Sequence, residues 1–482
     1  MAMKTLTLET SDGYKVVTPA GLDSVTTYVL LEQETWFEKE LPFLRHVLQS
    51  GMTAIDIGAN LGVYSLAMAK LVGPQGRVFA YEPASEPRGL LEQSRKLNGA
   101  DNLEIISAAL SDGAREGHLV FGTSSELNAL GDGGAGERVR ITSLDLEAAA
   151  HNWASLDFIK IDAEGEEERV LAGGKNLFAH HSPLVQFEVK AGAEVDMRLR
   201  NLLPQLGYKV YRLLAGAPIL VPLKDDELDR HFEINLFAAK PDRAATLTQQ
   251  GLLVEQVADW SPRSAVGEGL KLLMSQPCGA LMSGAGIGAN VPLDPDYAQC
   301  LDAFAAWRSS ATPLAGRCAA LAFAYRGLQA LRAKGDTASR MSTLARVAAE
   351  FGQRTACFET TTAILAALRQ GAIKLNEPFW PATARFDVFA PPGQIGQWFA
   401  IAAAEAEEYA RGFSSMFVDP GRVSWMAKHP FGKLEMERRR VLIAARAGEN
   451  PAVTPRLCES VAGHLNAEIW RSGKVPGTRL DA

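Results

Sequence analysis

Apolar positions in the first half of the chain alternate between short runs and helical spacings, a pattern typical of an α/β domain. An apolar run at 53–57 is followed by a glycine-flanked turn at 58–62, apolar positions at helical spacing over 63–71, and a second apolar run at 77–81. Short apolar runs of this kind predict buried strands, and the segment between them predicts a helix. We therefore expect a parallel strand–helix–strand unit with a right-handed crossover.

The same pattern continues on both sides of this unit. Residues 1–30 alternate polar and apolar positions, which predicts a hairpin covering the edge of the domain. Further strands are expected at 103–110, 139–146, 156–161, 183–189, 208–214 and 232–239, and helices at 32–49, 85–98 and 196–206. Together these elements predict a doubly wound sheet of seven mostly parallel strands, with one strand reversed at the end.

Beyond residue 242 the pattern changes to alanine-rich helices. They are expected at 265–274, 297–308, 317–332, 338–351, 355–369, 395–411, 434–446 and 457–472. Six of the eight tryptophans lie in this half, which indicates a packed core instead of a disordered tail. We predict a division into an α/β domain at 1–242 and an all-helical domain at 243–482. The segment 344–356 faintly resembles a tetratricopeptide helix pair, so the helical domain is a candidate for binding a protein partner or for self-association.

Composition narrows the class of protein. The 482 residues are 47% hydrophobic, which is enough for a sizeable core, and a net charge of −7 argues against a nucleic-acid partner. Five cysteines without a C-x-x-C pair indicate neither a disulfide framework nor a zinc site. No signal peptide and no apolar run long enough to span a membrane are visible, so a cytoplasmic protein is expected.

The turn after the first strand indicates the class of cofactor. A dinucleotide would require G-x-G-x-x-G and a pyrophosphate, but this chain has G-A-N-L-G preceded by Asp56, whose carboxylate would repel phosphate. Asp56 suits a cationic amino-acid group, with the turn at Gly58, Ala59 and Asn60 beneath it. Glu82, at the end of the next strand, could accept hydrogen bonds from ribose hydroxyls. One acid for an ammonium and one for a ribose predict S-adenosyl-L-methionine (SAM).

Two further carboxylates are candidates for catalysis. Asp162 and Glu188 end adjacent predicted strands, and ligands bind at the carboxyl ends of strands in doubly wound sheets. Either residue could act as a general base or orient the acceptor. They could instead hold a divalent metal that lowers the pKa of the acceptor, although no ligand pattern indicates one. The loop at 123–128 is expected to contact the acceptor, because loops carry specificity.

Four motifs, in order, resemble the FkbM family of methyltransferases. They are D-I-G-A-N-L-G-V-Y-S-L from Asp56, Y-E-P from Tyr81, A-A-L-S-D from Ala108 and F-I-K-I-D-A-E-G from Phe158. The resemblance covers about residues 20–240 and implies the class I SAM-dependent fold. It also implies methyl transfer to hydroxyl oxygens of sugars or polyketide products, with Ala109 and Leu110 framing the adenine.

The expected function is therefore SAM-dependent O-methylation of a hydroxyl on a saccharide or glycan precursor. The first alternative is a methyltransferase acting on a non-sugar small molecule, either polyketide-like or with a nitrogen acceptor. The second is a helical scaffold protein whose first half only binds SAM.

Overall fold

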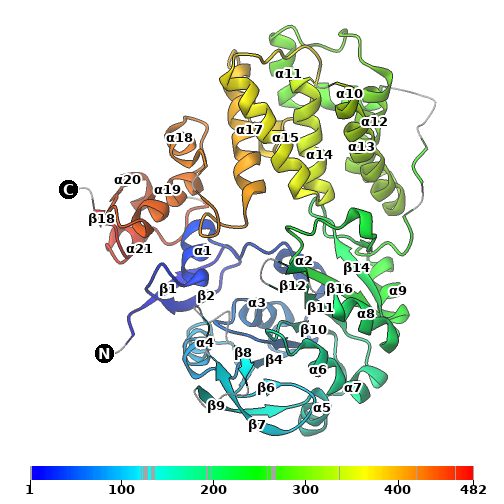
Figure 1. The fold of residues 1–482 in the computed structure, drawn as a ribbon. Helices are drawn as coiled ribbons and strands as arrows, with labels where there is room; N and C mark the ends of the chain where they lie inside the picture. The colour runs from blue at the N-terminus through cyan, green and yellow to red at the C-terminus, as the bar shows by residue number, and fades with distance from the viewer. Residues whose placement is uncertain are drawn as a thin grey trace.

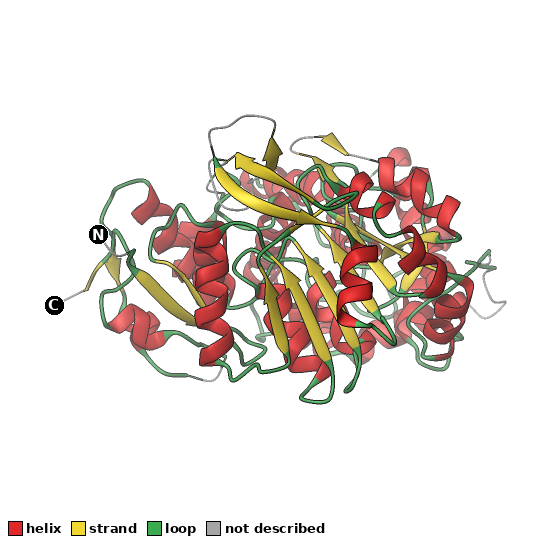
Figure 2. Cartoon of the chain, turned by 90° about the horizontal axis from the view of Figure 1, so that it is seen from below, coloured by secondary structure: helices red, strands yellow, loops and turns green. Residues whose placement is uncertain are grey.

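The computed structural model describes residues 3–480, apart from 121, 123–128, 132–135, 192–193, 196, 258, 262–266, 336, 420 and 462. Its centre is a twisted sheet of strand order β15-β14-β16-β11-β10-β3-β4-β5 (Figures 1 and 2). These strands are β3 (Thr53–Ile57), β4 (Arg77–Tyr81), β5 (Leu103–Ile106), β10 (Phe158–Ile161), β11 (Leu184–Glu188), β14 (Lys209–Leu213), β15 (Leu220–Pro222) and β16 (Asn235–Ala239). The five strands from β5 to β11 are parallel, whereas β16 runs antiparallel to both of its neighbours. The expected mostly parallel sheet is confirmed, with eight strands instead of seven because β15 adds an edge strand.

Strand alternation assigns the two faces of the sheet to two separate cores. Ala54 and Val78 belong to one core, and Ile55 and Phe79 belong to the other, because successive side chains of a strand point to opposite faces. Helices packing on the first face are α1 (Val25–Gln33), α2 (Glu40–Val47), α3 (Val63–Val72), α4 (Ser85–Leu97) and α9 (Pro241–Gln249). Those on the second are α5 (Leu144–His151), α6 (Glu167–Ala172), α7 (Lys175–His180), α8 (Arg198–Leu202) and the 3-10 turn η2 (Leu203–Leu206).

Two predicted strands were wrong in extent. The strand expected at 103–110 divides into β5 and β6 (Ala109–Leu110), which leaves the main sheet and pairs with β9 (Glu137–Thr142). The strand expected at 139–146 ends at Thr142, because Ser143 caps α5 by accepting a hydrogen bond from the backbone N–H of Leu146. With β7 (Arg115–Val120) and β8 (Ala129–Gly131), β6 and β9 form a small second sheet.

The helix expected at 32–49 is also wrong, since α1 and α2 are separate. Helix α1 ends at Glu34, whose φ of 62° is left-handed and leaves the helix. The Glu34 carboxylate lies 3.3 Å from the guanidinium of Arg438 and accepts a hydrogen bond from the backbone N–H of Leu465 at 2.8 Å. These partners lie about 400 residues further along the chain, so tertiary contacts fix this break. The predicted hairpin is present as β1 (Thr5–Glu9) and β2 (Lys15–Pro19).

The second half is largely helical, as expected, although a tetratricopeptide arrangement is not shown. Its helices are α10 (Glu268–Ser275), α11 (Pro277–Gly284), α12 (Pro295–Arg308), α13 (Leu314–Lys334), α14 (Ala338–Phe351), α15 (Arg354–Arg369), α16 (Arg385–Val388), α17 (Ile395–Arg411), α18 (Val423–Lys428), α19 (Leu434–Arg446), α20 (Pro455–Cys458) and α21 (Ala467–Arg471). The helix expected at 457–472 is instead two short helices separated by an irregular stretch that contains Gly463, with φ of 75°. Short strand pairs complete the chain: β12 (Lys190–Ala191) with β13 (Glu194–Val195), and β17 (Ala452–Val453) with β18 (Arg479–Leu480).

This helical region contacts the sheet-containing part at two places. Leu214, which follows β14, and Val221, within the edge strand β15, share a core with α10–α19. At the other end of the region, α19 packs against α1, and Leu442 and Trp470 belong to the same core as the hairpin residue Leu6 (Figure 1). Because the two halves share buried side chains, the division at residue 242 remains a prediction. No helix within the described residues is long and apolar enough to cross a membrane.

Candidate active site

A cavity of about 630 Å³ opens at the carboxyl ends of β3, β4, β10 and β11. Parallel sheets hold their ligands at this edge. Eight of the nine predicted site residues line it: Gly58, Ala59, Asn60, Glu82, Ala109, Leu110, Asp162 and Glu188. The ninth, Asp56, does not line it. The cavity thus brings the predicted cofactor turn and the predicted catalytic carboxylates into one space.

The glycine turn depends on a close backbone contact. Gly58 has φ of 78°, and a Cβ atom at this position would lie 1.8 Å from the backbone oxygen of Asp162. Only glycine therefore fits between β3 and the end of β10. The backbone N–H groups of Gly58 and Ala59 both donate to the Tyr81 carbonyl at 3.1 Å. The turn that carries the cofactor residues and the residue that carries the candidate base are thus fixed against each other.

Glu82 braces the same turn from the adjacent strand. Its carboxylate accepts hydrogen bonds from the backbone N–H groups of Asn60 and Ala84, each at 2.8 Å. Burial raises the pKa of Glu82 to about 7, against the lowering effect of these two bonds. The side-chain oxygen of Asn60 is buried and has no hydrogen-bond partner. The Glu82 carboxylate and the Asn60 side-chain oxygen are hydrogen-bond acceptors, which suits the hydroxyl and ammonium donors of SAM, so these residues fit this cofactor.

Asp56 takes a different position from the one expected. It is 1% exposed and lies beneath α3, where Ser65 Oγ donates to Asp56 Oδ2 at 2.5 Å. Burial raises the pKa of Asp56, and its other oxygen, Oδ1, has no partner. Strand alternation accounts for this, because Ile55 and Ile57 face the opposite core. A direct contact between Asp56 and the cofactor therefore stays a prediction.

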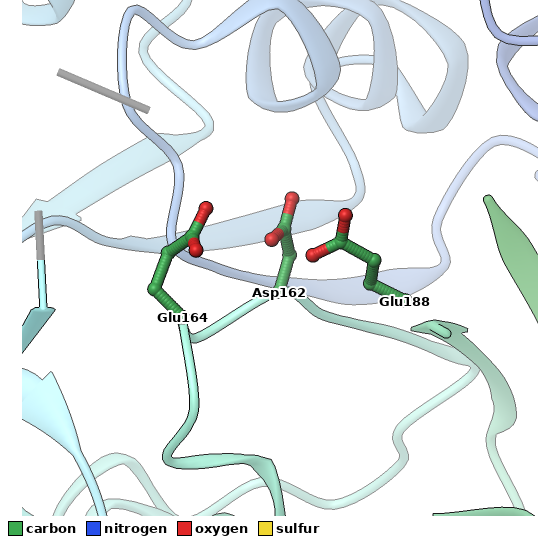
Figure 3. Close-up of side chains that lie close together, drawn as sticks. All are labelled: Asp162, Glu164 and Glu188. Carbon is green, nitrogen blue, oxygen red and sulfur yellow. The ribbon is translucent and has the colours of Figure 1, made fainter. Parts of the chain in front are cut away.

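Three carboxylates gather opposite the glycine turn. Asp162, Glu164 and Glu188 each offer an oxygen, and these oxygens lie within 4.8 Å of one another (Figure 3). Lys160 Nζ donates to Asp162 Oδ2 at 2.5 Å. Burial, followed by the negative charge of Asp162, raises the pKa of Glu188 well above its ordinary range. The arrangement therefore favours a protonated Glu188 hydrogen-bonded to a charged Asp162. The divalent-metal alternative rests on the acidic cluster alone.

A polar network next to this cluster escaped the sequence-based prediction. Glu38, between α1 and α2, accepts hydrogen bonds from Trp36 Nε1 at 2.9 Å and from Tyr64 OH at 2.6 Å. The Lys160 ammonium lies 5.0 Å from the centre of the Tyr64 ring. The signal available in the sequence was Lys160, a charged residue within the otherwise apolar strand β10. This residue is 4% exposed. A buried lysine requires a carboxylate partner, which indicates a site at this strand.

An aromatic wall closes another side of the cavity, and part of it comes from the helical region. We use "aromatic wall" for Trp36, Phe37, Phe413 and Phe417, all of which line the cavity. The Phe37 ring lies 4.6 Å from the Trp36 ring, 5.4 Å from the Phe413 ring and 6.1 Å from the Phe417 ring. The sequence did not predict this wall, because nothing local connects residues 36 and 413. The loop at 123–128, expected to contact the acceptor, lies outside the described residues.

A second cavity of about 550 Å³ lies between the sheet-containing part and the helical region. It shares Phe37, Glu38, Ile234 and Phe413 with the first cavity. These four residues form the partition between the two spaces. The helical region is therefore in direct contact with the candidate active site.

Comparison with known proteins agrees with this geometry. A family model described as the methyltransferase FkbM domain matches residues 56–210. No curated protein matches the chain significantly.

Several solved structures are similar over parts of the chain. A methyltransferase FkbM from Methylobacillus flagellatus KT has 16% identity and a TM-score of 0.27; the match covers 39% of this chain and 43% of that one, less than half its length. A SAM-dependent O-methyltransferase from Thermotoga maritima has 18% identity and a TM-score of 0.26, covering 49% of this chain and 77% of that one. A putative methyltransferase from Streptococcus mutans in complex with SAH has 11% identity and a TM-score of 0.25, covering 42% and 95%. TM-scores this low carry no argument, so the assignment of residues 56–210 to a methyltransferase domain rests on the matched family model.

Proposed function

Residues 56–210 form an FkbM methyltransferase domain of the SAM-dependent type, and from this premise we propose that the chain methylates a hydroxyl oxygen of a saccharide or glycan precursor. One observation carries the proposal. The backbone of Asp162 packs against Gly58 of the cofactor turn, and its carboxylate faces the same cavity. The chain thereby holds a candidate base at a fixed position relative to the cofactor residues.

The chain's own residues supply alignment and a destination for the acceptor's proton. SAM, when bound, supplies an electrophilic methyl group on a sulfonium. Glu82 and the turn at Gly58–Asn60 would hold its ribose and amino-acid portions. Orienting two reactants in this way is worth about 7–11 kcal/mol of the barrier. Asp162 would accept the proton from the acceptor hydroxyl as the oxygen bonds to the methyl carbon and the carbon–sulfur bond breaks.

Lys160 and Glu188 surround Asp162 and favour its charged, proton-accepting form. The ammonium of the buried Lys160, 2.5 Å from Asp162, balances the negative charge of that carboxylate. Glu188 keeps its proton because burial and the charge of Asp162 disfavour a second carboxylate, as the raised pKa indicates. The proton of Glu188 is donated to Asp162, so its other oxygen can accept a hydrogen bond from a second hydroxyl of the acceptor and orient it. We therefore assign proton transfer to Asp162 and orientation to Glu188.

The aromatic wall supports a second candidate, a non-sugar acceptor that also carries a hydroxyl. An aromatic or apolar ring that packs on such a wall removes apolar surface from water. A nitrogen acceptor has no observation in its favour. A scaffold that merely binds SAM is disfavoured, because Phe413 and Phe417 of the helical region line the cavity.

The test is transfer of labelled methyl from SAM to sugar nucleotides and glycosides by the wild type, Asp162→Asn and Glu168→Gln. Glu168 is 40% exposed and lies in a surface ion pair, so its variant is the control. General-base catalysis typically contributes about 10²–10⁴-fold, so Asp162→Asn should lose that much turnover while its SAM affinity by calorimetry stays within about threefold. A wild type that labels no hydroxyl compound would contradict the function. Full turnover by Asp162→Asn would remove Asp162 from the mechanism.

A further inference from the structure

We infer that Phe413 and Phe417, which lie outside the matched methyltransferase domain, determine the acceptor by binding an aromatic or apolar ring attached to the hydroxyl compound. This rests on the proposed function, since the acceptor is that of the proposed methyl transfer. The inference also gives the helical region a role, namely to complete the active site.

The wall has the geometry of a binding surface for a ring. Phe37 meets Phe417 edge to face at 76° and lies tilted by 37° to Phe413. Phe417 is 50% exposed although it lines the cavity. A half-exposed phenylalanine beside two partly buried aromatic rings leaves apolar surface that a ligand ring would remove from water.

The segment that carries these rings is held from two sides. From the helical region, the Arg354 guanidinium donates to the carbonyls of Tyr409, Ala410 and Gly412 at the end of α17. The same guanidinium lies 4.3 Å from the centre of the Phe413 ring. Phe413 is therefore fixed by a cation whose hydrogen bonds go to the segment's own backbone.

From the other side, α1 holds the same segment. Gln33 Nε2 donates to the carbonyl of Phe413 at 2.6 Å, and the backbone N–H of Ser415 donates to the Glu32 carboxylate at 3.0 Å. Tyr28 OH and Ser415 Oγ are 3.0 Å apart. Phe413 is thus placed before any ligand arrives, and Phe417 follows two residues after the anchored Ser415. A preformed surface loses little entropy on binding.

The acidic cluster and the aromatic wall come from different elements of the cavity, with Glu38 hydrogen-bonded to Trp36 of the wall. Asp162, Glu164 and Glu188 lie at the strand ends, whereas the wall is provided by the α1–α2 connection and the segment after α17. A compound with a hydroxyl at one end and a ring at the other matches both parts. A small, fully polar sugar matches only the carboxylates. The structure therefore assigns the acceptor to hydroxyl compounds bearing a ring substituent, such as aryl glycosides.

The test compares two probes that differ only in the aglycone, phenyl β-D-glucopyranoside and methyl β-D-glucopyranoside. Calorimetry on the full-length protein saturated with S-adenosylhomocysteine should show that the aryl glycoside binds at least tenfold more tightly. Phe413→Ala and Phe417→Ala should each reduce that preference to threefold or less, with the affinity for S-adenosylhomocysteine unchanged. Trp425→Ala is the control, because Trp425 is a 43% exposed aromatic residue that lines neither cavity.

Equal affinities of the two glycosides, no binding of either, or a preference that survives both substitutions would overturn the inference. Phe417→Ala keeps the test decisive if Phe413→Ala proves unstable, since Phe417 is half exposed. Failure of the proposed function is separate: it would appear as no transfer of labelled methyl from SAM to any hydroxyl compound. The aryl preference is measured by binding, so it is tested independently of that transfer.

Discussion

Replacing Gly58 by alanine isolates the close backbone contact between the cofactor turn and the candidate base. Gly58 has φ of 78°, in the left-handed region, and a Cβ atom there would lie 1.8 Å from the Asp162 carbonyl oxygen. Alanine in the left-handed region costs about 1–2 kcal/mol. Forcing extra volume into a packed site typically costs a further ~1–3 kcal/mol, so the unfolding free energy should fall by about 2–5 kcal/mol.

Gly207→Ala provides a matched control. Gly207 has φ of 83°, and no atom lies within 4 Å of the point that a Cβ would occupy, so this variant carries the backbone strain without the clash. It should lose only about 1–2 kcal/mol. Guanidinium unfolding of both variants, followed by fluorescence, gives the two free energies if their denaturant slopes agree with the wild type.

The difference between the two glycine variants measures the steric term. We expect Gly58→Ala to be less stable than Gly207→Ala by about 1–3 kcal/mol. Its SAM affinity should also fall, since the Asp162 backbone must move. A Gly58→Ala variant as stable as Gly207→Ala would refute the claim that β3 and the end of β10 are in contact at this point.

Three further predictions follow from buried charges. The pKa of Glu82 is raised from 4.5 to about 7, so this group alone should lower wild-type stability by up to about 3 kcal/mol as pH rises from 4.5 to 7. In pH-dependent melting Glu82→Gln should lose about that much less stability than the wild type over this range, and by calorimetry it should bind SAM at least tenfold more weakly; equal losses would contradict the argument. Glu188→Gln should keep turnover within about tenfold in the labelled-methyl assay, because glutamine imitates the protonated acid; a loss as large as that of Asp162→Asn would mean that Glu188 is the base. Arg439→Met should lower the unfolding free energy by about 3–5 kcal/mol, because it leaves the buried carboxylates of Glu32 and Glu408 without this cation. The control Arg471→Met removes an exposed ion pair and should change the unfolding free energy by less than about 1 kcal/mol. Equal effects of the two substitutions would contradict the argument.

Local patterns were sufficient for the elements that position the cofactor turn. The apolar runs of β3 and β4, with the glycines between them, specify a strand, a turn and a helix without reference to distant residues. The same alternation accounts for the burial of Asp56: Ile55 and Ile57 face one core, so the carboxylate between them faces the other, under α3.

Contacts between distant segments account for what the sequence left unpredicted. The break after α1 depends on Glu34 meeting Arg438, and the aromatic wall depends on Phe37 meeting Phe413. Nothing in the sequence around Glu34 or Phe413 indicates which distant residue each will contact. Lys160 is the exception, since a lysine within a buried strand predicts a carboxylate nearby.

The shared core of the two chain ends has a consequence for synthesis on the ribosome. Leu6 of the hairpin belongs to a cluster that includes Leu442 and Trp470, so its packing waits for the last part of the chain. At about 5–20 residues per second, the roughly 200 residues between the end of the sheet and α19 take about 10–40 s to translate. Throughout that interval the apolar surface that the hairpin later buries against Leu442 and Trp470 stays exposed to water, so we expect a chaperone to bind it.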